Sequence, residues 1–173
     1  HSHPHIQKKV IIETRVKESQ AANNIIGGKE IYYLGLTEGK FSGEIEQKDI
    51  LNTIRKIIRD RKPSKIFTHS LDDPHPDHKD VYEFTNRLLT AVKYKGDLYS
   101  FNVWNLFFNI RRRDSPKLVV NITNNFQQKI KAFNCHESQA LAKISLMWNI
   151  YFQAIINGLN YDMKYAEVFY KLQ

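Results

Sequence analysis

The sequence is almost devoid of cysteine, with Cys135 the only one in 173 residues. A single thiol excludes an internal disulfide and fits a reducing compartment, so we expect a cytoplasmic protein. Long apolar runs are also missing, and none approaches the roughly 18 residues of a transmembrane helix. The short apolar run at residues 10–12 does not resemble the hydrophobic region of a signal peptide.

The remaining composition is that of an ordinary globular protein, with 42% hydrophobic and 25% charged residues. The length fits one domain with a real core. The net charge is +8, and basic residues cluster at positions 55–65 and 111–113. Such clusters are usually solvated surface, and the alternative is an anionic partner such as nucleic acid, a sugar phosphate or a membrane surface.

Hydrophobic periodicity and turn residues divide the chain into alternating helices and strands. Helices are predicted over residues 7–26, 44–62 and 78–94, and from residue 124 onward with a break at Asn157 and Gly158. Strands are predicted over residues 30–36, 65–70, 97–105 and 117–123. This alternation favours an α/β fold with a mostly parallel sheet covered by helices.

The segment "SLDDPHPDHKDVY", residues 70–82, follows a predicted strand and enters a predicted helix. Ligands of open parallel sheets bind beyond the carboxyl ends of the strands. Pro76 suits a first helical turn, and Asp77 lies near the positive end of the helix dipole. His75 and His78 are three residues apart and can face one cleft, where they could supply one or two of about three zinc ligands. Alternatively, Asp72 or Asp73 caps a turn and the histidines are surface residues.

Several segments together resemble the LmbE-like (PIG-L type) N-acetylglucosaminyl deacetylase family. "THSLDDPHPDH" resembles its second signature. "TRVKESQAANNIIGGKEIYYLGLTEGKF" is similar to its R-x-x-E helix and its strand ending in LGL-P-D-G, with Thr37 and Glu38 replacing the usual Pro and Asp. "KIKAFNCHESQ" resembles its K…H-x-S-Q segment, and "YAEVF" its Y-A-E-x-F close. The four matches occur in the family's order and cover residues 10–170.

The resemblance implies a Rossmann-like, three-layer α/β fold and a zinc-dependent hydrolase that removes the acetyl group from an N-acetylglucosamine-containing substrate. By matching positions, His78 is a metal ligand, His75 is the general acid or oxyanion donor, and Asp77 orients His75. Arg15 and His136 are expected near the substrate. The alternatives are a surface arginine paired with a glutamate three residues on, and a histidine at a helix boundary.

The family's first signature, A-H-P-D-D-E, holds two metal ligands and the general base, and it does not occur in this sequence. "HSHPH" has no carboxylate after its His-Pro pair, and only nine residues separate His5 from Arg15. We therefore expect residues 1–173 to be a single LmbE-like domain that begins downstream of a strand-helix-strand portion.

Two alternative functions and two minor sites stay open from the sequence. The protein could be an inactive relative that binds a sugar or metabolite. It could also be a basic nucleic-acid-binding module, although no nucleic-acid motif occurs and acids alternate with the bases of helix 44–62.

Homo-oligomers are common in the family. The aromatic residues of segment 101–110 fit the core, an acceptor pocket or a subunit contact. His69 is interpreted as a packing residue, and Glu167 as structural.

Overall fold

The computed structural model describes residues 4–47, 49–104 and 116–173. The chain forms two compact units, each assembled from two separate stretches of sequence. The first unit comprises His1–Tyr33 and Asn121–Ala166, and the second comprises Leu34–Val120 and Glu167–Gln173. Among the helices of the described residues, none combines the length and the apolar character needed to cross a bilayer.

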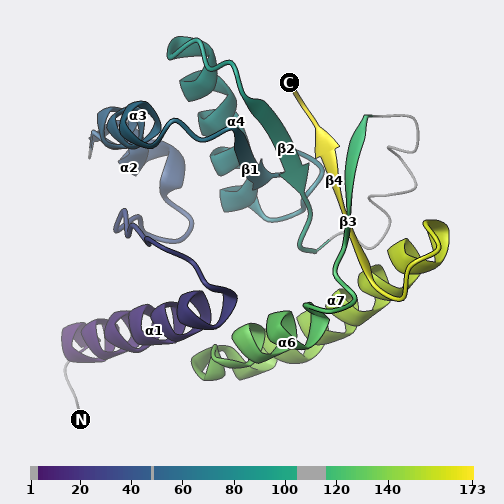
Figure 1. Cartoon of the computed structure of the whole chain (residues 1–173). Coiled ribbons are helices and arrows are strands. Elements are labelled where there is room, and N and C mark those ends of the chain that lie inside the picture. Colours follow the sequence, from purple (N-terminus) through teal and green to yellow (C-terminus); the bar gives the residue numbers. More distant parts are fainter. Residues whose placement is uncertain (1–3, 48, 105–115) are drawn as a thin grey trace. The chain divides into compact units, whose positions relative to one another are not determined.

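The second unit carries a four-stranded sheet in the order β1-β2-β4-β3 (Figure 1). The strands are β1 (Lys65–His69), β2 (Asp97–Phe101), β3 (Lys117–Asn121) and β4 (Ala166–Lys171). β1 and β2 are parallel, with Lys65 opposite Asp97, whereas β2 and β4 are antiparallel, with Ser100 opposite Tyr170. The α/β fold is confirmed, but the sheet is mixed, so the prediction of a mostly parallel sheet is not confirmed.

Three helices belong to the same unit: α2 (Phe41–Gln47), α3 (Ile50–Arg61) and α4 (Pro76–Ala91). α4 packs against β1, and α2 packs against both α3 and α4 (Figure 1). Their shared core contains the buried side chains of Ile45, Ile50, Phe84 and Leu88. The apolar stripe of α3 supplies one face of this core because its residues recur at helical spacing.

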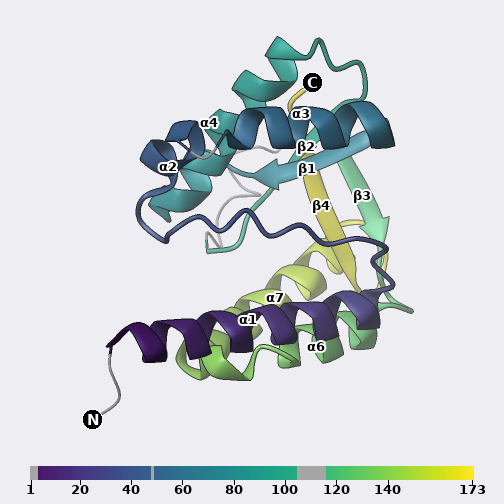
Figure 2. The same ribbon diagram turned by 90° about the vertical axis from the view of Figure 1, so that its left-hand side faces the viewer.

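The first unit is helical, with α1 (Pro4–Ile26), α6 (Phe126–Asn134), a short 3₁₀ turn η1 (Glu137–Gln139) and α7 (Ala140–Asn160). α1 lies along α6, and Gln128 Nε2 donates to the Ile25 carbonyl over 2.6 Å (Figure 2). The fully buried Phe126 ring stacks on Tyr165 and meets Tyr151 edge-on, with centroids 4.0 and 5.0 Å away. These rings form the centre of the unit.

Two predicted elements near the N-terminal half of the second unit were wrong. Residues 30–36 form no strand, because no described strand pairs with them, and Gly35 within them adopts a left-handed conformation with φ 64°. Leu34 and Leu36 nevertheless pack against the core. The single helix predicted over residues 44–62 is two helices, α2 and α3, and Asp49 between them adopts a left-handed conformation with φ 51°.

The predictions for the C-terminal half also need correction. The helical region breaks at residues 135–139, whereas α7 continues through Asn157 and Gly158. A Cβ at Gly158 would lie 2.5 Å from the Met163 carbonyl, so this glycine permits a close approach of the following turn and does not end the helix. β4 was not predicted, and β2 ends at Phe101. The basic residues 111–113 and much of the aromatic segment 101–110 lie outside the described residues.

Candidate metal centre

The turn after β1 brings three potential metal ligands together. His69 ends β1, Asp73 lies in the turn and His78 lies in the first turn of α4. Their ligand atoms all lie within 4.8 Å of one another. The turn is held locally, because the Asp73 N–H donates to the Ser70 carbonyl and the Asp72 N–H donates to Ser70 Oγ, both over 3.2 Å.

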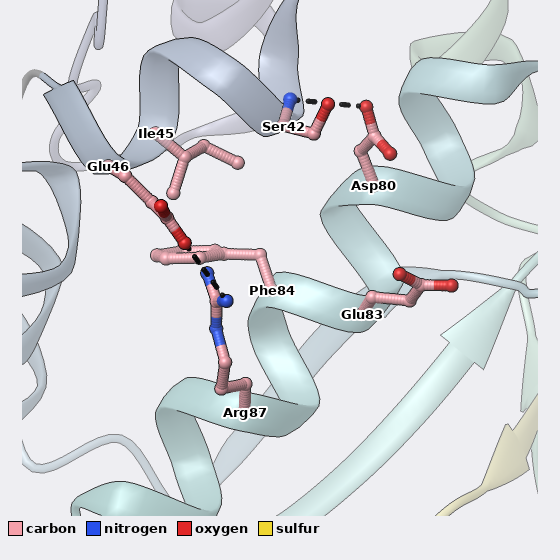
Figure 3. Close-up of a pocket in the computed structure, with 7 residues that line it drawn as sticks. All are labelled: Ser42, Ile45, Glu46, Asp80, Glu83, Phe84 and Arg87. Atoms are coloured by element: carbon pink, nitrogen blue, oxygen red, sulfur yellow. Dashed lines mark hydrogen bonds and ion pairs between the residues drawn. The ribbon is translucent and has the colours of Figure 1, made fainter.

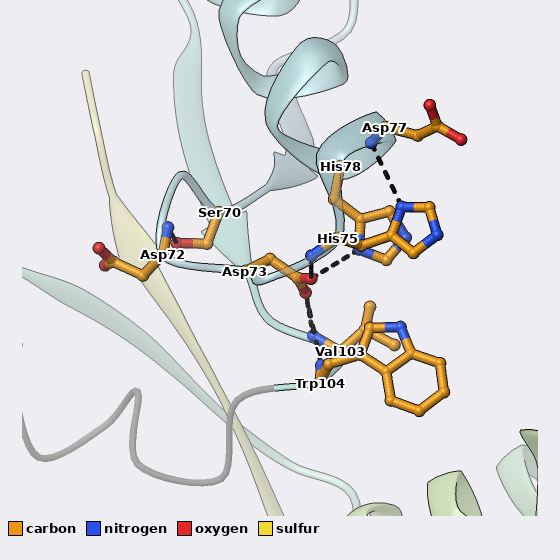
Figure 4. Close-up of polar contacts among 8 residues, drawn as sticks. All are labelled: Ser70, Asp72, Asp73, His75, Asp77, His78, Val103 and Trp104. Atoms are coloured by element: carbon orange, nitrogen blue, oxygen red, sulfur yellow. Dashed lines mark hydrogen bonds and ion pairs between the residues drawn. The ribbon is translucent and has the colours of Figure 1, made fainter. Parts of the chain in front are cut away.

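The carboxylate of Asp73 is the buried centre of this turn, with 0% of the residue exposed (Figure 4). Its Oδ1 accepts from the His75 N–H over 3.1 Å, and its Oδ2 accepts from the N–H groups of Val103 and Trp104 over 3.1 and 3.4 Å. Burial raises the pKa of Asp73, but the N–H groups of His75 and Val103 and the His78 ring lower it by more. The pKa is therefore below its ordinary value, and the group is an anion at neutral pH.

The rings of His69 and His78 stack with centroids 3.8 Å apart, and those of His75 and His78 lie 4.7 Å apart. The Nδ1 atoms of His69 and His78 are buried and make no hydrogen bond within the described part of the chain. His78 Nδ1 does lie 2.9 Å from Asp73 Oδ1. That distance suits an ion pair, but the ring N–H is not aligned for a hydrogen bond.

Burial is the main cause that lowers the pKa of His69, to about 4, and the neighbouring His78 lowers it further. His69 is therefore neutral at pH 7, and a neutral imidazole has a lone pair to offer. Buried polar atoms without partners are rare in folded proteins. Two such imidazole nitrogens beside a carboxylate form a donor set that zinc commonly uses, so these residues fit a zinc ion.

His75 caps the N-terminus of α4 and is thereby held in one orientation. Its Nδ1 accepts a hydrogen bond from the Asp77 N–H over 3.2 Å. An imidazole nitrogen that accepts a hydrogen bond carries no proton, so in the neutral ring the proton lies on Nε2. Pro76 at the start of the helix has no N–H to leave unpaired, which suits this position.

The Asp77 carboxylate is nearly buried and connects α4 to the loop before α2. Both of its oxygens accept from the Gly39 N–H, over 3.0 and 2.9 Å. The sequence predicted that this carboxylate orients His75. In the structure, the contact with the His75 ring comes from the backbone N–H of Asp77.

Arg15 and His136 belong to the first unit, on α1 and directly before η1. Nearby, the two carboxylate oxygens of Glu18 accept from the N–H and the Oγ–H of Ser138, each over 2.7 Å. These bonds lower the pKa of Glu18. They connect the R-x-x-E helix to the H-x-S-Q segment, and the roles of Arg15 and His136 toward a substrate stay predictions.

Two members of this cluster, His69 and Asp73, are not among the metal ligands expected from the sequence. His69 was interpreted as packing, although it is the last residue of a strand whose carboxyl end faces the motif. That position at the end of the strand was the feature of the sequence that could have identified His69. Asp73 does cap the turn through the His75 N–H, as the alternative interpretation held, and it also approaches the His78 ring.

A separate pocket of about 220 Å³ lies between α2 and α4 (Figure 3). Ser42 donates to Asp80 over 3.3 Å at one side, and Arg87 pairs with Glu46 over 3.3 Å at the other. None of the histidines of the cluster lines it. We therefore place the chemistry at the turn after β1 and not in this pocket.

Comparison with known structures shows a shared fold at low sequence identity. GalB, the 4-carboxy-2-hydroxymuconate hydratase of Pseudomonas putida KT2440, aligns with a TM-score of 0.68 and 19% identity, over 93% of this chain and 72% of that one. The N,N'-diacetylchitobiose deacetylase of Pyrococcus horikoshii aligns with a TM-score of 0.68 and 20% identity, over 92% of this chain and 63% of that one. Teicoplanin deacetylase Orf2, in a zinc-inhibited form, gives a TM-score of 0.66 and 14% identity, over 93% and 74%.

Because these identities are low, the structural likeness shows the fold alone, and the fold is shared by a hydratase and by deacetylases. The sequence model of the family described as PIG-L, GlcNAc-PI de-N-acetylase, matches residues 1–89, which include the whole histidine motif. The protein therefore belongs to the PIG-L family of GlcNAc-PI de-N-acetylases.

Proposed function

We propose that this protein is a zinc-dependent hydrolase that removes the acetyl group from an N-acetylglucosamine-containing substrate. One observation carries the proposal: two imidazole rings and a buried carboxylate, those of His69, His78 and Asp73, converge with ligand atoms within 4.8 Å of one another at the carboxyl end of β1. Family membership and the deacetylases among the structural neighbours support the same reaction.

His78 is the residue that both the resemblance and the geometry favour as a metal ligand, and His69 offers a second nitrogen beside it. A bound zinc ion acts as a Lewis acid and lowers the pKa of its water to about 7. Asp73 supplies a negative charge next to these imidazoles. The net charge of the site therefore suits a divalent cation.

His75 has the geometry of a proton donor. With Nδ1 occupied by the Asp77 N–H, the proton on Nε2 is available to an oxyanion that develops on the acetyl carbonyl. The same nitrogen can then transfer its proton to the departing amine. Asp77 keeps the helix start in place through Gly39, so that His75 does not need to reorganise during the reaction.

We further propose an N-acetylated amino sugar as the partner, with Arg15 and His136 near it. We also propose a Rossmann-like architecture for the domain. A relative that binds a sugar without hydrolysing it is the main alternative, because the described residues supply no carboxylate that we assign as the general base. Acetate release separates the two, since only the enzyme produces it.

The test uses the protein loaded with zinc and a panel of N-acetylglucosamine conjugates, with acetate release as the measurement. We expect stoichiometric zinc and activity in the wild type. His78→Ala should lose both, with activity reduced by roughly 100-fold or more since the metal is lost. Lys79→Ala, at the exposed next residue of the same helical turn, is the matched control and should retain both.

If His78→Ala keeps its zinc and its activity, the proposed metal centre is wrong. If the zinc-loaded wild type binds the sugars but releases no acetate from any of them, the protein is an inactive relative.

A further inference from the structure

We infer that Asp73 is a positioning residue, which orients the ring of His78 and joins the metal centre to the backbone segment after β2, and that it is not itself a metal ligand. The effect of Asp73 on catalysis rests on the proposed function. Its effect on metal binding can be measured without a substrate. The inference comes from the contacts around one buried carboxylate.

Three of the acceptor directions of this carboxylate are occupied by backbone N–H groups, and the fourth faces the ring of His78. A carboxylate has about four lone-pair directions. Asp73 has four nitrogen neighbours, namely the N–H groups of His75, Val103 and Trp104 at 3.1, 3.1 and 3.4 Å, and His78 Nδ1 at 2.9 Å. A cation on this carboxylate would compete with these four contacts, and a donor left unpaired in a buried place costs roughly 1–3 kcal/mol.

The four contacts come from two different parts of the second unit. His75 caps α4, His78 lies in its first turn, and Val103 and Trp104 follow β2 (Figure 4). β1 and β2 are parallel neighbours, so their carboxyl ends lie at the same edge of the sheet. Asp73 therefore holds both strand ends and the helix start in one arrangement.

The contact with His78 also has a chemical consequence. A carboxylate beside Nδ1 favours the tautomer that carries its proton there, which leaves the Nε2 lone pair for a metal and increases its basicity. The 2.9 Å contact is within hydrogen-bonding distance. Outer carboxylates of this kind commonly hold metal-binding histidines in place.

The first test measures the tautomer of His78 in the metal-free wild type by ¹⁵N NMR of the imidazole. We expect the proton on Nδ1. A neutral ring with its proton on Nε2 would overturn the inference. This measurement needs no variant, so it stands even if substitutions at Asp73 prevent folding.

The second test measures zinc affinity in Asp73→Asn by calorimetry, with the fold checked by circular dichroism. An amide cannot accept from all four groups, so we expect zinc binding to weaken roughly 10- to 100-fold, the usual effect of losing an outer partner. Asp72→Asn, at the neighbouring aspartate whose side chain points away from the histidines in Figure 4, should stay within about twofold of the wild type.

Cobalt substitution distinguishes positioning from ligation. If Asp73 only positions His78, cobalt-loaded Asp73→Asn keeps the visible absorption bands of the wild type at saturation. A changed spectrum, or unchanged zinc affinity, contradicts the inference. Because no readout requires a substrate, a protein that releases no acetate still tests the role of Asp73.

Discussion

His69 shows at the scale of a single residue how burial sets chemistry. Its ring is stacked on His78, its Nδ1 makes no hydrogen bond to the residues that the structure describes, and desolvation lowers its pKa to about 4. In the unfolded chain, the pKa of a histidine returns to about 6.5. Between these two values the unfolded state binds more protons than the folded state, so protonation favours unfolding.

We therefore predict that the metal-free protein loses stability as the pH falls. The contribution of His69 is complete above pH 6.5 and is lost progressively as the pH falls toward the folded pKa of about 4. Urea unfolding of the chelated wild type and of His69→Gln, followed between pH 7 and pH 4.5, measures the difference. Parallel pH dependences in the two proteins would show that His69 is not buried as a neutral ring.

At the scale of the elements, helix ends are decided by packing as much as by local sequence. The Asn157 and Gly158 pair suggested an end to the helix, yet α7 extends to Asn160. Gly158 is needed because the backbone of Met163 and Lys164 returns close to it, with carbonyl oxygens 2.5 and 2.7 Å from the place of a Cβ. Gly43 in α2 has nothing within 4 Å of that place and no such requirement.

This contrast predicts opposite effects of the same substitution. Gly158→Ala should destabilise the protein by roughly 1–3 kcal/mol, because the methyl group clashes with backbone that cannot move without distorting the turn. Gly43→Ala should be neutral or stabilise by up to about 1 kcal/mol, because alanine favours the helix. Chemical denaturation of both variants measures this. A Gly158→Ala protein as stable as the wild type would disprove the close approach.

At the scale of the whole molecule, the net charge of +8 gives the protein a general attraction to anions. A groove of about 500 Å³ carries part of this charge, with Arg55, Arg59, Lys62 and Lys95 along it. Arg59 is also paired with Asp60 over 3.1 Å. Charges of this kind produce non-specific attraction, which is distinct from the base contacts that a nucleic-acid reader needs.

We predict weak binding of duplex DNA that depends steeply on salt and not on sequence. The dissociation constant at physiological salt should be no tighter than about 1 µM, as expected for phosphate contacts alone. Fluorescence anisotropy with two unrelated duplexes between 50 and 200 mM salt measures this. Submicromolar binding to one duplex only, in the presence of competitor, would instead support the nucleic-acid-binding alternative.

The family and the start of α4 could be predicted from the sequence because both depend on residues close together in the chain. The order His75, Pro76, Asp77, His78 caps and begins a helix wherever it follows a turn, and the structure has this helix start. The apolar residues at helical spacing that predict helix 44–62 are a local signal of the same kind, and those of α3 do pack into the core.

The sheet order, the antiparallel β4 and the partners of Asp73 were decided only by the tertiary structure. β4 pairs with a strand some 70 residues earlier, and Asp73 bonds to backbone 30 residues later. His69 becomes a member of the site because packing stacks it on His78. Sequence by itself determined which chemical groups this protein has at the end of β1. Folding determined which of them meet, because contacts between distant residues depend on the packing of the whole unit.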